Sequence, residues 1–80
     1  MNEKELEEAI KHRTDNVKNY QTDLDNFNLA IEELDNNFAE EIGANKFKIE
    51  LEGRISDIMF QQLKEQVLLN VLERRLKDLL

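Results

Sequence analysis

The chain of 80 residues contains no cysteine, no proline and no tryptophan, and it has only two glycines. Without cysteine it has no disulfide, no thiol nucleophile and no cysteine-ligated zinc site. Without proline, and with so little glycine, it has few turn signals, which argues against a many-stranded sandwich or barrel. These absences favour one small helical domain that must be stabilised by packing alone.

Long apolar runs are also missing. Apolar stretches reach at most three residues, as in Ile58–Phe60. A membrane-spanning helix needs about 20 apolar residues in succession, and a secretory signal needs a basic start followed by an apolar segment. Because neither pattern is present, we expect a soluble, cytoplasmic protein that does not contact a membrane.

Acidic residues outnumber basic ones, 18 to 11, and the excess lies in one half of the chain. Residues 1–42 hold 12 acidic and 4 basic side chains, whereas residues 43–80 hold 6 and 7. Contact with the phosphates of nucleic acid needs a basic surface, so this balance argues against direct nucleic-acid binding. The acidic half would either keep a small protein in solution or attract a basic surface on a protein partner.

Residues 3–42 have the pattern of one long, coiled-coil-like helix. Asn2 followed by Glu5 has the form of a helix cap, and Gly43 is expected to end the helix in a left-handed conformation. Between them, apolar residues recur at steps of three and four through five heptads. Position a holds Ile10, Val17, Leu24, Ile31 and Phe38, and position d holds Leu6, Arg13, Tyr20, Phe27, Leu34 and Glu41.

Arg13 occupies a d position, where an apolar residue is preferred. No side chain three or four residues away is a carboxylate, so we expect an ion-pair partner for Arg13 on another helix. We also expect Arg13→Leu to raise the melting temperature, because it removes a poorly solvated charge. The bulky Tyr20 and Phe27 at d favour an antiparallel hairpin or a bundle over a parallel zipper.

The segment around Gly43 and Gly53 has two interpretations. Residues 46–52 alternate polar and apolar side chains, which is the pattern of a half-buried strand or extended connector. Phe47, Leu51 and Ile55 are also spaced by four residues, as in a helix. We predict a connector over 43–55 with a short strand or extended segment at 46–52, and helix is the alternative. A lone strand would need a pairing partner from a second copy or another protein.

Residues 56–80 are predicted to form a second helix with Ser56 as its N-cap. Its apolar residues form two stripes on different sides, so the helix needs two neighbours. The long helix, folded back, supplies one neighbour, and a second copy of the chain supplies the other. One stripe contains Ile55, Ile58, Leu69, Leu72, Leu76 and Leu79, interrupted by Gln62 and Glu65, and the other contains Phe60, Leu63, Val67 and Val71.

The predicted fold is therefore all-α: a single helical-hairpin domain over residues 1–80, present as a homodimer. The predicted oligomer or partner interface consists of Phe60, Leu63, Val67, Val71, Leu69, Leu72, Leu76 and Leu79.

Groups for catalysis are scarce, with one His, one Ser, one Tyr and two Thr in the whole chain. A catalytic triad would have to use Ser56 and His12, and Ser56 is better explained as a helix cap. Glu8, His12 and Asp15 have a spacing that suits a divalent metal, but a surface helix of mixed charge explains them better. No glycine-rich loop is present to bind phosphate. We predict no enzymatic activity, no metal site and no cofactor.

Two classes of function fit the sequence. The first is a small, non-catalytic, oligomerising accessory protein that presents an acidic helical surface to a protein partner. The alternative is an acidic inhibitor whose carboxylates, along residues 1–42, imitate nucleic-acid phosphates in a basic groove of its target. Complexes of the first kind should survive moderate salt, whereas those of the second should weaken steeply.

Overall fold

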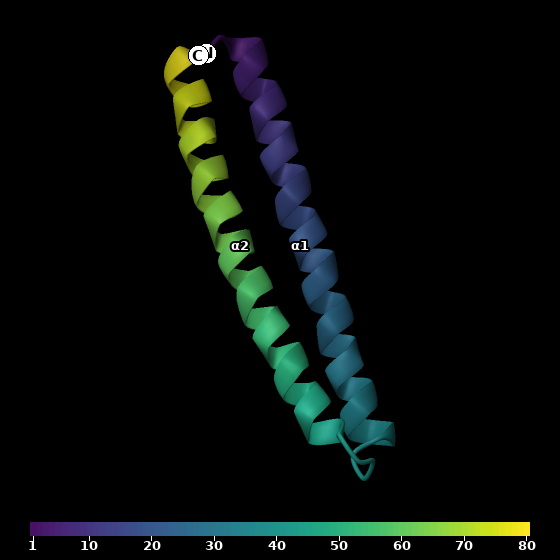
Figure 1. Cartoon of the computed structure of the whole chain (residues 1–80). Coiled ribbons are helices and arrows are strands. Elements are labelled where there is room, and N and C mark those ends of the chain that lie inside the picture. Colours follow the sequence, from purple (N-terminus) through teal and green to yellow (C-terminus); the bar gives the residue numbers. More distant parts are fainter.

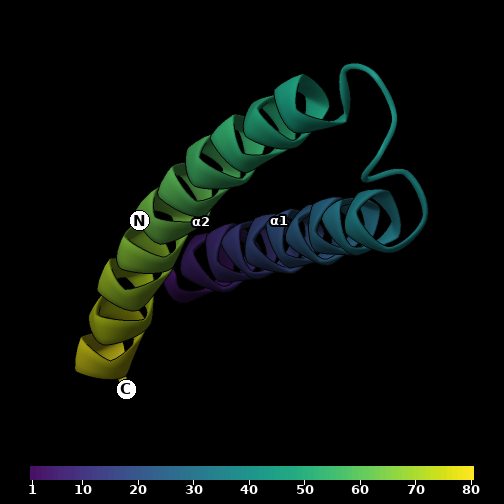
Figure 2. The ribbon, with the colours of Figure 1, turned by 90° about the horizontal axis from the view of Figure 1, so that it is seen from below.

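A computed structural model describes all 80 residues as two antiparallel helices joined by a short turn (Figure 1). Helix α1 spans Glu3–Asn37 and helix α2 spans Ala44–Leu79, and there is no strand. The hairpin measures 58 × 15 × 13 Å along its principal axes. The N- and C-termini lie near each other at the end opposite the turn. Figure 2 shows that the two helices cross at an angle. The predicted all-α helical hairpin is confirmed.

Helix α1 begins with the cap that the sequence predicts. The side-chain Oδ1 of Asn2 accepts a hydrogen bond of 2.8 Å from the backbone N–H of Glu5. Glu3 and Glu5 lie in the first turn, where negative charge is favoured by the helix dipole. The helix continues without a break through Arg13 and Thr14, and the Thr14 hydroxyl donates to the carbonyl of Ile10 at 2.8 Å. One helix therefore carries the whole heptad pattern from Leu6 to Leu34.

The end of α1 lies five residues before the predicted one, at Asn37 rather than position 42. The chain reverses through two successive tight turns: the N–H of Glu41 donates to the carbonyl of Phe38, and the N–H of Ala44 donates to that of Glu41. Gly43 has the predicted left-handed conformation, with φ of 88°, but it begins α2 instead of ending α1. Because the reversal needs these residues, Phe38 and Glu41 leave the heptad pattern and are exposed.

The predicted connector over 43–55 and the strand or extended segment at 46–52 are wrong, because α2 begins at Ala44. The spacing by four residues decides this segment: it places Leu51 against α1, with only 4% of its surface exposed. The alternative strand would have had no partner strand in the chain. Ser56 is consequently not an N-cap but an exposed residue within the helix.

The core is a single interhelical contact along the length of the rod. Helix α1 contributes its a and d positions from Leu6 to Leu34, all of them buried or half-buried, as predicted. Helix α2 contributes the stripe that includes Leu69. Only five of the 80 residues are buried, because two helices can cover just one side of each other. The buried residues are Leu6, Leu24, Leu34, Leu51 and Leu69.

Candidate functional site

One apolar surface of α2 faces away from α1. We call it the outer stripe: Phe60, Leu63, Val67 and Val71, whose exposed fractions are 59, 60, 53 and 47%. These residues follow one another at steps of three and four, so they share a helix face. Leu69 is two residues from both Val67 and Val71, which places it on the opposite face, where it is 6% exposed. The two apolar stripes of α2 therefore lie on opposite sides of the helix.

Of the eight residues predicted as an oligomer or partner interface, four form the outer stripe, three lie in the contact with α1, and Leu79 belongs to neither set. Leu69 is buried in the contact between the helices, and Leu72 and Leu76 are half-buried on the same face. Leu79, in the last turn, is 56% exposed. The contact within the chain thus uses Leu69, Leu72 and Leu76, while the outer stripe is left exposed to solvent.

An ion pair joins the helices at the point where each apolar pattern is interrupted. Nη1 of Arg13 donates to Oε1 of Glu65 at 2.9 Å and to Oε2 at 3.0 Å. Both side chains are partly shielded, with exposed fractions of 34% for Arg13 and 15% for Glu65. The expected partner of Arg13 on another helix is therefore present. The sequence did not identify this partner as Glu65, although Glu65 interrupts the apolar stripe of α2 that faces α1. We call this stripe the inner stripe: Ile55, Ile58, Leu69, Leu72 and Leu76.

The carboxyl of Glu65 is held in its charged form by this arrangement. Its pKa is lowered below the usual value, mainly because Arg13 donates a hydrogen bond to the carboxylate. Burial acts in the opposite direction, since it disfavours charge, and the nearby Asn16 and His12 add smaller lowering effects. The pair is therefore an ionic contact at pH 7, with a role in positioning one helix against the other.

Gln62, the other interruption of the inner stripe, also bridges the helices. Its Nε2 donates to the carbonyl of Val17 at 3.3 Å and to Oε1 of Gln21 at 3.1 Å. Near the turn, Nζ of Lys48 lies 3.0 Å from a carboxylate oxygen of Asp35. Each of these contacts requires one particular residue of α1 to lie opposite one particular residue of α2. The contacts therefore fix the register of the hairpin as well as stabilising it.

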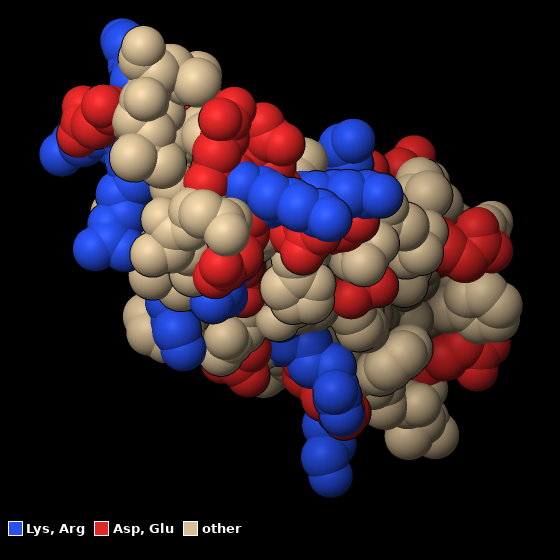
Figure 3. All heavy atoms as spheres, turned by 90° about the horizontal axis from the view of Figure 1, so that it is seen from above, with Lys and Arg blue, Asp and Glu red and all other residues tan.

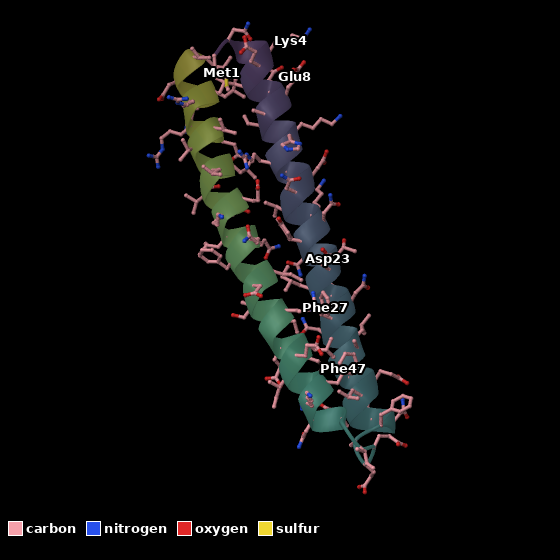
Figure 4. The ribbon with its side chains drawn as sticks, in the orientation of Figure 1. Met1, Lys4, Glu8, Asp23, Phe27 and Phe47 are labelled. Atoms are coloured by element: carbon pink, nitrogen blue, oxygen red, sulfur yellow. The ribbon has the colours of Figure 1, made fainter.

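A groove lies beside the turn, where α1 ends and α2 begins. It is open to solvent and has a volume of about 490 Å³, and its lining includes two carboxylates, those of Glu33 and Glu41. Phe27 of α1 and Phe47 of α2 both lie toward the turn end of the hairpin (Figure 4), and they line a neighbouring hollow together. We call this the turn groove; its apolar lining is Ala30, Leu34, Phe38, Ile42, Ala44 and Phe47.

Helix α1 carries the acidic excess. All ten of its acidic side chains are exposed, against four basic residues in the same helix. At the end that holds both termini, acidic and basic side chains alternate over the surface (Figure 3), so no patch of one sign forms there. The negative charge is distributed along the helix: Glu3, Glu5, Glu7, Glu8, Asp15, Asp23, Asp25, Glu32, Glu33 and Asp35.

The structure forms no catalytic or metal-binding arrangement from the candidate residues. Ser56 on α2 and His12 on α1 are both exposed. No group of three or more His, Cys, Asp or Glu side chains is placed to hold a metal ion, and this includes the set of Glu8, His12 and Asp15. Neither helix has an apolar stretch long enough to cross a membrane.

Comparison of the chain with protein-family models, with curated proteins and with solved structures finds no match.

Proposed function

We propose that this protein is a non-catalytic interaction module that forms a homodimer through the outer stripe of α2 and presents an acidic helical surface to a protein partner. The observation that carries the proposal is the outer stripe itself. Four large apolar residues on one helix face are about half exposed. Removing such surface from water is favourable by roughly 25 cal/mol per Å². A two-helix rod with five buried residues has much to gain from that contact.

The turn groove supports the second part of the proposal. It combines an apolar lining with the carboxylates of Glu33 and Glu41 and adjoins the acidic helix α1. A partner that suits it has apolar side chains flanked by Lys or Arg. The acidic charge would speed the encounter, and apolar burial would supply most of the affinity.

A second candidate function follows from the exposure of all ten acidic side chains of α1. In that role the protein is an inhibitor that occupies a nucleic-acid-binding groove, with its carboxylates in place of phosphates. Its affinity would come mainly from charge. Salt therefore separates the two functions: affinity for the partner persists at moderate salt in the first and falls steeply in the second.

Self-association is tested with two matched variants, Leu63→Lys on the outer stripe and Leu29→Lys on α1. Both leucines are 60% exposed in the hairpin, so the substitutions affect the monomer similarly. At micromolar concentration, light scattering should give twice the chain mass of 9.5 kDa for the parent and for Leu29→Lys. Leu63→Lys should give the monomer mass, with its helical circular dichroism retained. A parent protein of monomer mass would refute the dimer.

The partner-binding part is tested by affinity capture from cells of the source organism, followed by a salt titration of the captured complex. Phe47→Ser, in the turn groove, should release the partner, whereas Leu63→Lys should weaken capture only through loss of the dimer. Retention of the partner by Phe47→Ser, combined with release by moderate salt alone, would favour the inhibitor function instead.

A further inference from the structure

We infer that the outer stripe of α2 binds the outer stripe of a second copy in antiparallel orientation, with Asp57 of each copy beside Arg75 of the other. The inference rests on the proposed function, because it specifies the geometry of the proposed dimer. It is drawn from the order of apolar and charged residues along the exposed face of α2.

The outer stripe has a defined length and centre. From Phe60 to Val71 it covers 11 helical steps, or about 16 Å along the axis. Its midpoint lies between positions 65 and 66. A two-fold axis at that point, perpendicular to α2, places Phe60 of one copy opposite Val71 of the other. Leu63 then lies opposite Val67, so the four apolar residues of one copy face those of the other.

The charges at the two ends of the stripe are opposite in sign. Asp57 lies just before the stripe, and Arg74 and Arg75 lie just after it; all three are exposed. Asp57 and Arg75 are 18 residues apart, which is five helical turns, so they project on the same side of the stripe. In an antiparallel pair each Asp57 therefore meets Arg75 of the other copy, and this contact occurs twice.

A parallel pair lacks this complementarity. It would place Arg74 beside Arg74 of the second copy, and like charges at close range are destabilising. Lys64, near the middle of the stripe, does not oppose the antiparallel arrangement. Its Nζ lies 5.5 Å from the centre of the Phe60 ring, on the side of Lys64 away from the midpoint, so the two Lys64 ammonium groups diverge.

The distribution of charge between the helices also favours α2 over α1 as the contact surface between the two copies. Helix α1 carries 10 acidic and 4 basic residues, whereas α2 carries 6 and 7. Pairing through α1 would bring two strongly negative surfaces together. Pairing through α2 joins two nearly neutral helices and leaves both acidic helices on the outside of the dimer, where they remain free to attract a basic partner.

The orientation is tested by disulfide mapping, for which the absence of native cysteine is an advantage. Ser56→Cys and Arg74→Cys are prepared as separate single variants, because both residues are exposed and face each other across the antiparallel pair. Mild oxidation of an equimolar mixture should yield the 56–74 disulfide between copies as the main product. Neither variant alone should crosslink efficiently, since like positions lie about 25–29 Å apart along the axis. Mixing Ser56→Cys with Asn19→Cys, an exposed position on α1, supplies the background level.

Each outcome of the crosslinking experiment either supports or overturns the antiparallel arrangement. The 56–74 crosslink above background supports the inference. Crosslinks joining 56 to 56 and 74 to 74 would mean a parallel dimer, which overturns the inference and retains the proposed dimer. A dimer without crosslinks at either position uses another surface and also overturns it. A monomer by light scattering removes both the inference and the proposed dimer.

Charge reversal gives an independent readout. Asp57→Arg alone and Arg75→Asp alone should each raise the dimer dissociation constant by on the order of 10-fold, because each places like charges together twice. The double variant restores both pairs with the charges exchanged and should return the constant to within about 3-fold of the parent. Additive weakening in the double variant would show that the two residues do not meet.

Discussion

Arg13 of α1 and Glu65 of α2, 52 residues apart in the sequence, form an ion pair with Nη1 placed 2.9 and 3.0 Å from the two carboxylate oxygens. Each residue interrupts the apolar pattern of its own helix. Because Arg13 and Glu65 lie opposite each other, each charged group is paired with the other and not with an apolar surface. The pair is compatible with one register of the hairpin, and a shift of either helix by one turn would leave both charges unpaired.

The ion pair reverses the expectation that Arg13→Leu alone stabilises the protein. With Glu65 shielded to 15% exposure, loss of Arg13 leaves a carboxylate without its main partner. The free energy of unfolding in urea at neutral pH should fall by about 1–2 kcal/mol for Arg13→Leu. The double replacement by Leu at both positions should be at least as stable as the parent. A single variant as stable as the parent would mean that the pair contributes nothing.

The lowered pKa of Glu65 predicts a dependence of stability on pH. Because the folded-state pKa is below the unfolded one, the stabilisation is complete above the unfolded value of about 4.3 and is lost as the pH falls through the folded value. Between about pH 6 and pH 3 the unfolding free energy of Glu65→Gln should therefore fall less than that of the parent. Glu73→Gln, at an exposed position, is the control and should retain the parental slope. Equal slopes for Glu65→Gln and the parent would contradict the prediction.

Two Leu→Ala substitutions in α1 should lower the free energy of unfolding by different amounts, because the heptad register buries one leucine and exposes the other. Leu24 is 7% exposed and Leu29 is 60% exposed. Leu24→Ala should lower the unfolding free energy by about 2–4 kcal/mol, because it removes buried methyl groups and leaves a cavity. Leu29→Ala should change it by less than about 1 kcal/mol. Both are compared in urea at one protein concentration, and equal losses would show that the register is misplaced.

The two glycines predict effects of opposite sign. Gly43 has φ of 88°, whereas Gly53 lies inside α2, and an added Cβ would meet no atom within 4 Å at either site. Gly43→Ala should destabilise by about 1 kcal/mol, because a side chain strains the left-handed conformation. Gly53→Ala should stabilise by about 0.5–1 kcal/mol, since alanine is the better helix former. Thermal melts of the two variants at equal concentration test this, and a stabilising Gly43→Ala would contradict the turn geometry.

Much of α1 was predictable because its signals are local. The cap at Asn2 depends on a residue three positions away, and the heptad spacing from Leu6 to Leu34 is set by helix periodicity alone. The two stripes of the second helix were predictable for the same reason. Residues 46–52 were predicted wrongly, because a short segment can satisfy both the period of a strand and the spacing of a helix, and only the availability of a partner strand separates the two structures.

The sequence alone determined that the protein is helical, that its long first helix has one apolar side, and that its second helix has two. These properties follow from the spacing of apolar residues along each segment. The tertiary structure decided which stripe of α2 faces α1, that the chain reverses over residues 38–43, and that Glu65 is the partner of Arg13. The physical reason is that the place of the reversal fixes which residues lie opposite each other, and that place depends on packing between helices far apart in the sequence.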